Sequence, residues 1–160
     1  MKSKLQEAIQ FRADNRPEES IQLLRTLLLE HPKDPNINLQ MAWTCDSMGK
    51  EKEAVLYYET AISAGLTEGR LDALLGLGST YRCLGEYTKS IKIFDQAILE
   101  FPQERALRVF RALTLFNLHN AEKSIEELLI QLLDTTTDSS IKSYDRALRF
   151  YSDKLSETWK

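Results

Sequence analysis

The sequence repeats itself with a period close to 34 residues, and this repeat restricts the possible folds more than any other feature. One position of the repeat holds Leu24, Tyr58, Phe94 and Leu128, at steps of 34, 36 and 34 residues. Five further positions each keep one type of residue: Ala8, Ala42, Gly78 and Ala112; Ser20, Ala54, Ser90 and Ser124; Ile21, Val55, Ile91 and Ile125; Leu28, Ile62, Ile98 and Leu132; and Asn15, Gly49, Gly85 and His119. A fixed period of this length predicts a solenoid of stacked helical hairpins.

The segment 71–102 shows what one repeat contains. Apolar residues recur at helical spacing on both sides of Gly85, and Pro102 closes the second run. Glycine adopts the left-handed conformation that ends many helices, so the segment is predicted to be a helix, a tight turn and a second helix. The residues that match Gly85 in the other repeats are also of types that adopt positive φ more readily than most.

The best copy of the repeat reads Leu74-x2-Leu77-Gly78-x2-Tyr81, then Ser90-x3-Phe94, then Pro102. It resembles the pattern of the tetratricopeptide repeat family, which is W-x2-L-G-x2-Y, then A-x3-F, then P. The resemblance implies an all-α fold, a right-handed superhelical solenoid of antiparallel hairpins, as one domain over residues 1–160. We expect repeats at about 1–34, 35–70, 71–104 and 105–138 and a capping helix at about 139–159, which makes nine helices.

The glycines of the third repeat need an explanation, because glycine inside a helix costs about 1 kcal/mol relative to alanine. In the family, the two helices of a hairpin cross closely at small residues, and Gly78 and Ser90 occupy those positions here. Gly85 is expected to form the turn. Gly76 is not a family position, and two explanations stay open: a dent on the inner face, or simple tolerance.

Turn chemistry predicts where helices begin. Asp34 is expected to cap a helix that starts at Pro35, and Pro17 is expected to start another. The stretch 64–70 holds the two extra residues of the second repeat. The polar stretch 134–140 is expected to connect the last hairpin to the final helix, whose apolar stripe is Ile141, Tyr144, Leu148, Tyr151 and Leu155.

Charge and composition argue against several classes of partner. The 160 residues carry a net charge of −3, which does not favour nucleic acid or an anionic membrane surface. The start of the chain lacks an apolar run of signal-peptide length, so we expect a cytoplasmic protein. Cys45 and Cys83 match no disulfide or metal pattern and are expected to be buried or half-buried thiols. Met1 and the final helix favour a complete small protein.

The sequence contains no convincing catalytic set, so we expect neither an enzyme nor a cofactor. His31 and His119 fall in turns far apart in the sequence, with no metal-ligand spacing around them. The pairs Glu18-Glu19 and Glu126-Glu127 lie early in helices, where the helix dipole explains them. Gly76 and Gly78 follow no strand, which excludes a nucleotide-binding loop.

The resemblance places the binding surface on the concave face, which the first helix of each hairpin lines. The matching positions of this chain give an apolar strip: Leu39, Trp43, Leu75, Val109, Phe110 and Phe116. Gln6, Gln40, Arg12 and Arg82 are expected to orient a bound segment, and the two arginines suit an acidic group. Alternatively, the final helix covers Val109, Phe110 and Phe116.

One family subtype clamps the acidic C-terminal tails of chaperones with basic and amide side chains. The matching positions here hold Leu5, Ile9, Gln40, Asp72 and Gly76, so this clamp is absent and we expect no such binding. The leading hypothesis is an adaptor that binds a peptide or helix of another protein in the concave groove. The alternatives are a homodimer, through the groove or the terminal helix, and an enzyme or regulatory subunit whose chemistry the sequence hides.

Overall fold

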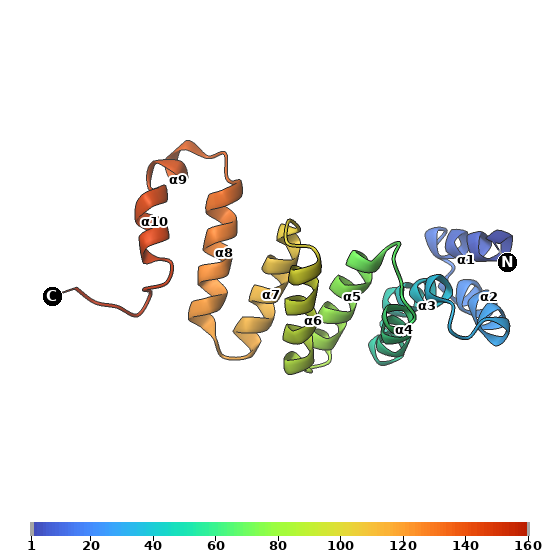
Figure 1. The fold of residues 1–160 in the computed structure, drawn as a ribbon. Coiled ribbons are helices and arrows are strands. Elements are labelled where there is room, and N and C mark those ends of the chain that lie inside the picture. The colour runs from blue at the N-terminus through green and yellow to red at the C-terminus, as the bar shows by residue number, and fades with distance from the viewer. Residues whose placement is uncertain (1, 160) are drawn as a thin grey trace. The chain divides into compact units, whose positions relative to one another are not determined.

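The computed structural model describes residues 2–159, and the regular structure in this range is entirely helical (Figure 1). The helices are α1 (Lys2–Ala13), α2 (Pro17–Glu30), α3 (Pro35–Ser47), α4 (Glu51–Ser63), α5 (Arg70–Cys83), α6 (Tyr87–Glu100), α7 (Arg105–Asn117), α8 (Ala121–Thr135), α9 (Ser139–Ser143) and α10 (Asp145–Tyr151). The chain forms two compact units that divide after Glu86. The N-terminal unit contains the hairpins α1–α2 and α3–α4 and then α5; the C-terminal unit contains α6, the hairpin α7–α8 and then α9 and α10.

The turns confirm the repeat in the backbone itself. Asn15, Gly49, Gly85 and His119 all have positive φ, at 59°, 66°, 77° and 60°. After each of them, the next residue donates its amide N–H to the carbonyl oxygen five residues back, which satisfies a carbonyl at the end of the helix. These four bonds measure 2.8–3.0 Å and join Arg16 to Phe11, Lys50 to Cys45, Glu86 to Tyr81, and Asn120 to Leu115.

The helix starts also follow the sequence. Helix α2 begins at Pro17 and helix α3 at Pro35. A carboxylate oxygen of Asp34 accepts hydrogen bonds from the amides of Asn36 and Ile37, each at 2.9 Å. Asp34 therefore caps α3, because these amides have no partner within the helix.

Small residues lie in the core at both of the positions where each hairpin was expected to cross. Ala112 of α7 is fully buried, and the Ser124 hydroxyl of α8 donates to its carbonyl oxygen at 2.7 Å. A larger side chain at either position would force these two helices apart. The other members of these two positions are buried as well: Ala8, Ser20, Ala42, Ala54, Gly78 and Ser90.

A threonine position links α2 to α3 and α6 to α7 through a pair of hydroxyl groups, and it was not part of the sequence prediction. The Thr44 hydroxyl of α3 lies 3.3 Å from the Ser20 hydroxyl of α2. In the C-terminal unit, Thr114 of α7 lies 2.9 Å from Ser90 of α6 in the same way. Each threonine is buried, so the hydroxyl pair satisfies polar groups that water cannot reach.

Gly76 makes room for a tyrosine. A Cβ atom at this position would lie 2.5 Å from the Tyr58 hydroxyl oxygen and 2.7 Å from its Cζ. Tyr58 comes from α4, is fully buried, and donates from its hydroxyl to Asp46 of α3 at 2.6 Å. The absent side chain therefore leaves the space that Tyr58 fills, which explains a glycine that neither of the two sequence explanations described correctly.

The expected final helix is wrong in two respects. Residues 139–151 form two short helices, α9 and α10, with Tyr144 at φ −106° and ψ 9° between them, and the described residues after Tyr151 are not helical. Serine favours local hydrogen bonds over a continuous helix, and the Ser143 hydroxyl donates to the Ser140 carbonyl at 2.7 Å. The described range thus holds ten helices instead of nine.

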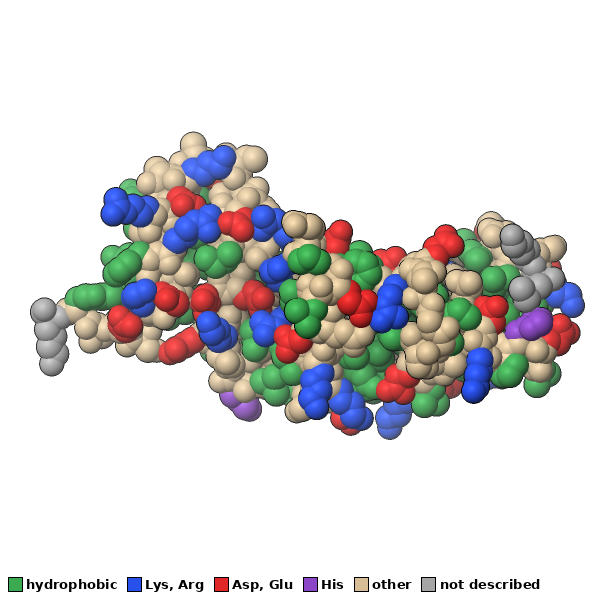
Figure 2. Space-filling model, in the orientation of Figure 1, with side chains coloured by type: hydrophobic (Ala, Val, Ile, Leu, Met, Phe, Trp, Pro, Cys, Tyr) green, Lys and Arg blue, Asp and Glu red, His purple; other side chains and the backbone are tan. Residues whose placement is uncertain are grey.

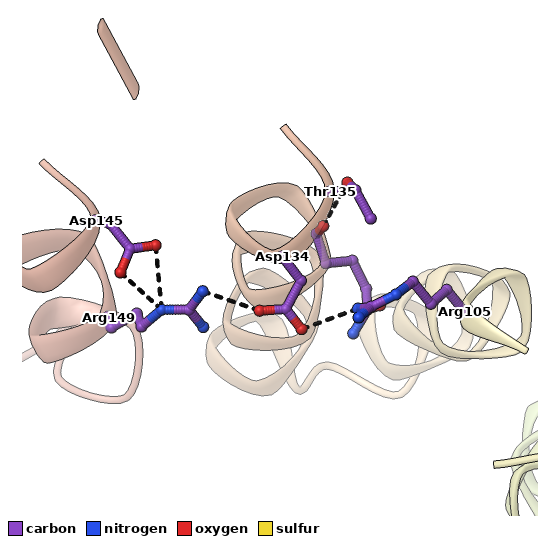
Figure 3. Close-up of polar contacts among 6 residues, drawn as sticks. Arg105, Asp134, Thr135, Asp145 and Arg149 are labelled. Carbon is purple, nitrogen blue, oxygen red and sulfur yellow. Dashed lines mark hydrogen bonds and ion pairs between the residues drawn. The ribbon is translucent and has the colours of Figure 1, made fainter. Parts of the chain in front are cut away.

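The final segment packs on α8 and leaves the expected inner residues of α7 exposed. Asp134 of α8 accepts from Arg105 of α7 and from Arg149 of α10, each at 2.9 Å (Figure 3). Val109 and Phe116 remain 37% and 64% exposed, so the alternative in which the last helix covers them does not hold. Cys45 is buried as expected, but Cys83 is exposed, contrary to the sequence prediction.

We predict that Gly76→Ala destabilises the protein by about 1–3 kcal/mol, because Tyr58 must move and its bond to Asp46 must lengthen. The helix propensity of alanine acts in the opposite direction by about 1 kcal/mol. Urea unfolding checks the change. In a Tyr58→Leu background the same substitution should cost much less, and an equal cost in both backgrounds would contradict the packing explanation.

Candidate functional site

A groove of about 630 Å³ lies in the N-terminal unit, between α1, α3 and the start of α5. Four of the ten residues expected at the binding surface line it together: Gln6, Leu39, Gln40 and Trp43. Leu5 and Ile9 of α1 add apolar surface, and the buried Ile37 of α3 lies beneath it. The groove therefore brings together the inner positions of the first two repeats, as the family pattern predicts.

Of the side chains described in residues 3–159, the charged ones that line this groove are all acidic. They are Asp34, Glu68 and Asp72. Asp34 already caps α3, whereas Glu68 and Asp72 are exposed. Within residues 2–159, neither of these two carboxylates forms an ion pair or a side-chain hydrogen bond. The family pattern placed Asp72 at an inner position where the chaperone clamp has other chemistry. It did not identify Glu68, which lies in the segment 64–70 that holds the two extra residues.

Arg12 is engaged inside the N-terminal unit. Its guanidinium donates to the carbonyl oxygen of Gln40 at 3.1 Å, to Gln40 Oε1 at 2.8 Å and to the Thr44 hydroxyl at 3.2 Å. Its Cζ also lies 5.5 Å from the centroid of the Trp43 ring. Burial lowers the pKa of Arg12, against the opposing influence of Tyr58. These contacts hold α1 against α3 and fix both Gln40 and Trp43 beside the groove.

The remaining expected residues lie outside this groove. Leu75 and Arg82 are half-buried on α5. Val109, Phe110 and Phe116 belong to α7 in the C-terminal unit, where the Phe110 ring stacks on Phe94 with centroids 6.3 Å apart. The structure thus assigns the expected residues to two sets, one in each unit.

Asp46, Tyr58 and Thr80 form a polar network behind the groove. Asp46 accepts from Tyr58 at 2.6 Å and from Thr80 at 3.3 Å. Burial raises the pKa of Asp46, although both hydrogen bonds act in the opposite direction. Burial and the Asp46 carboxylate also raise the pKa of Tyr58, so the phenol remains a donor. One position of the repeat holds threonine three times, as Thr44, Thr80 and Thr114. This recurrence could have indicated part of the network from the sequence.

The C-terminal unit has a second cavity, of about 540 Å³, between α7 and α8. Its charged groups are largely paired with one another: Arg111 lies 2.9 Å from Glu127, and Lys123 lies 2.6 Å from Glu126. Arg111 also bonds to Asp95 at 2.6 Å. On the face that Figure 2 shows, basic and acidic side chains lie among one another over this unit. Such pairing makes the cavity a weaker candidate than the groove.

Among residues 2–159, no group of three or more His, Cys, Asp or Glu side chains could hold a metal ion. In the same range, no helix has both the length and the apolar character needed to cross a membrane.

The chain belongs to the tetratricopeptide repeat family. The model of the family described as "Tetratrico peptide repeat" matches residues 35–155, which is most of the chain. This family and the helical hairpins together define the class of protein, an all-α tetratricopeptide repeat superhelix.

Solved structures agree with this fold at low sequence identity. The MamA protein is similar over 99% of this chain and 78% of its own, with a TM-score of 0.73 and 12% identity. A tetratricopeptide repeat protein from Parabacteroides merdae ATCC 43184 matches 94% of this chain and 59% of its own, with a TM-score of 0.74 and 17% identity. TTC0263, a thermophilic TPR protein in Thermus thermophilus, matches 96% of this chain and 84% of its own, with a TM-score of 0.64 and 21% identity. No curated protein matches the sequence.

We predict that the unfolding free energy of the wild type, compared with that of Asp46→Asn, is more favourable in acid than at neutral pH. The pKa of Asp46 is raised in the folded state above its unfolded value of about 3.9. The folded state therefore binds the proton more tightly, and stability falls as pH rises from the unfolded pKa through the folded one. Unfolding free energies of both proteins across this range check the sign. A difference that grows in favour of the wild type with rising pH would contradict it.

Proposed function

We propose that this protein is a non-enzymatic adaptor that binds a peptide or helix of another protein in the groove of its N-terminal unit. Proteins of this repeat family generally mediate protein–protein interactions and are generally not catalysts. The observation that carries the proposal is the groove itself, where three helices bring Leu5, Leu39 and Trp43 together with amide side chains. Both cysteines are free thiols, which supports a reducing compartment such as the cytoplasm.

Trp43 is the residue best placed to dominate binding. Tryptophan is enriched among residues that carry most of the energy of an interface. The indole of Trp43 is half-buried, lines the groove and is held in position by Arg12. A side chain that is already fixed loses little conformational freedom when a partner binds.

We predict that Trp43→Ala weakens capture of the natural partner at least tenfold, which corresponds to about 1.4 kcal/mol. The measurement is an affinity pull-down from native lysate, followed by titration of the protein that is recovered. Phe110→Ala is the matched control, because it removes an aromatic ring from the other unit. Circular dichroism and thermal unfolding verify that both variants fold. Equal capture by the wild type and Trp43→Ala would place the site outside this groove.

A second candidate function, self-association, rests on the outer face of α8. Leu128 is 36% exposed, whereas Leu24 and Phe94 at the same repeat position are fully buried. Ile125 and Leu132 of the same helix are 50% and 45% exposed. The corresponding outer face of α1 is polar and consists of Ser3, Glu7 and Gln10, with Asp14 in the turn that follows. One apolar face and one polar face favour a closed pair of two copies over an open chain of many.

Exposed aromatic rings form a second apolar cluster in the same unit. The Tyr151 ring centroid lies 5.4 Å from that of Phe150 and 5.6 Å from that of Trp159. All three side chains are about half exposed. An exposed aromatic cluster of this kind marks an interaction site more often than an inert surface.

We predict that Leu128→Lys reduces the mass of the protein in sedimentation at high micromolar concentration from that of a dimer to that of a monomer. A lysine at the centre of the apolar face would bury an unpaired charge in the pair. Leu56→Lys is the control, since Leu56 is exposed on α4 in the other unit. A wild type that sediments as a monomer throughout this range would rule out self-association and leave the groove proposal intact.

A further inference from the structure

We propose that the groove of the N-terminal unit binds a cationic segment, in which a Lys or Arg side chain pairs with Glu68 and Asp72 beside an apolar side chain that contacts Trp43. This inference rests on the proposed function and specifies the chemistry of the partner. It reverses the sequence expectation, in which Arg12 and Arg82 orient an acidic group.

The first reason is the sign of the charge around the groove. Among the side chains that the structure describes, residues 3–159, each charged one that lines it is a carboxylate. Glu68 and Asp72 are exposed and have no cationic partner among these same side chains. Carboxylates that share one concave surface attract cations and repel anions, which steers both the rate and the selectivity of binding.

The second reason is that Arg12 has other partners. Its guanidinium donates to the backbone and side chain of Gln40 and to Thr44, and it lies over the Trp43 ring. An acidic ligand would have to displace these hydrogen bonds. Because Gln40 Oε1 accepts from Arg12 at 2.8 Å, the amide nitrogen of Gln40 is the end of this side chain that can donate to a carbonyl of a bound peptide.

The third reason is that the backbone of the turn before α5 lies close to the apolar residues of the groove. Gly69 has φ +75°, and a Cβ atom there would lie 2.9 Å from Leu39 Cδ2 and 3.8 Å from the Trp43 ring. The backbone of this turn thus comes close to the apolar floor and places the neighbouring Glu68 in the lining. Acidic and apolar groups of the groove are adjacent, so one short segment can reach both.

The test is a selection of peptides from a random phage-displayed library on the immobilised full chain, with counter-selection on Trp43→Ala. We expect the selected peptides to carry Lys or Arg next to an apolar residue. Synthetic copies should bind roughly fivefold more weakly to Glu68→Gln/Asp72→Gln than to the wild type, because two exposed ion pairs are lost. Their binding should also weaken as salt is raised.

Glu7→Gln/Glu30→Gln is the matched control, because it removes the same charge from exposed positions outside the groove. It should leave the affinity unchanged. Neutral or acidic peptides that depend on Trp43, or cationic ones that bind Glu68→Gln/Asp72→Gln and the wild type equally, would overturn the inference and leave the groove function in place. Peptides that bind Trp43→Ala equally well, or no enrichment at all, would overturn both.

Discussion

The hairpins α1–α2, α3–α4 and α7–α8 each depend on two helices that approach closely at a pair of small residues. Ser124 shows how close the approach is, since its hydroxyl reaches the backbone carbonyl of Ala112 on the facing helix. A contact at this distance fixes which residues of the two helices face each other. It therefore also fixes which side chains point to the next repeat and which remain available to a partner. The positive φ at each turn follows from the same constraint, because the chain must reverse within a few residues.

Contacts between successive repeats use a pair of serine and threonine hydroxyl groups, and the second repeat lacks the serine. Ser20 and Ser90 each lie beside a threonine of the following helix, but the second repeat has Ala54 at this position. Thr80 accordingly lacks a serine partner and bonds to Asp46. Tyr58 reaches the same carboxylate, and its bulk requires the glycine at position 76. A half-buried carboxylate and a helical glycine, each unfavourable alone, therefore belong to one arrangement.

The sequence was sufficient for features that are local or repeated. The turn at Gly85, the cap at Asp34 and the small crossing residues depend on backbone geometry that recurs in each repeat, so their pattern is visible without coordinates. Gly76 occurs once and depends on side chains from two other helices, which no period reveals. The apolar spacing of the final segment did not reveal the break at Tyr144. Local hydrogen bonds of serine interrupt the helix there, although the apolar spacing continues.

The candidate site was predictable in position but not in charge. The family pattern located Gln6, Gln40 and Trp43, because inner positions follow from helix geometry. The partners of a guanidinium depend on neighbouring helices, so the sequence could not show that Arg12 bonds within the protein. Likewise, Glu68 lies in a turn that interrupts the period, and its place in the lining depends on how that turn folds.

The two extra residues of the segment 64–70 have a wider consequence. They lie outside the positions that hold the hairpins together, yet the turn they enlarge contributes both Glu68 and Gly69 to the groove. The residues at which the helices cross and this turn therefore lie in separate parts of the repeat. Under the proposed function, a change of length in the turn would alter the charge that lines the groove and leave the crossing residues in place.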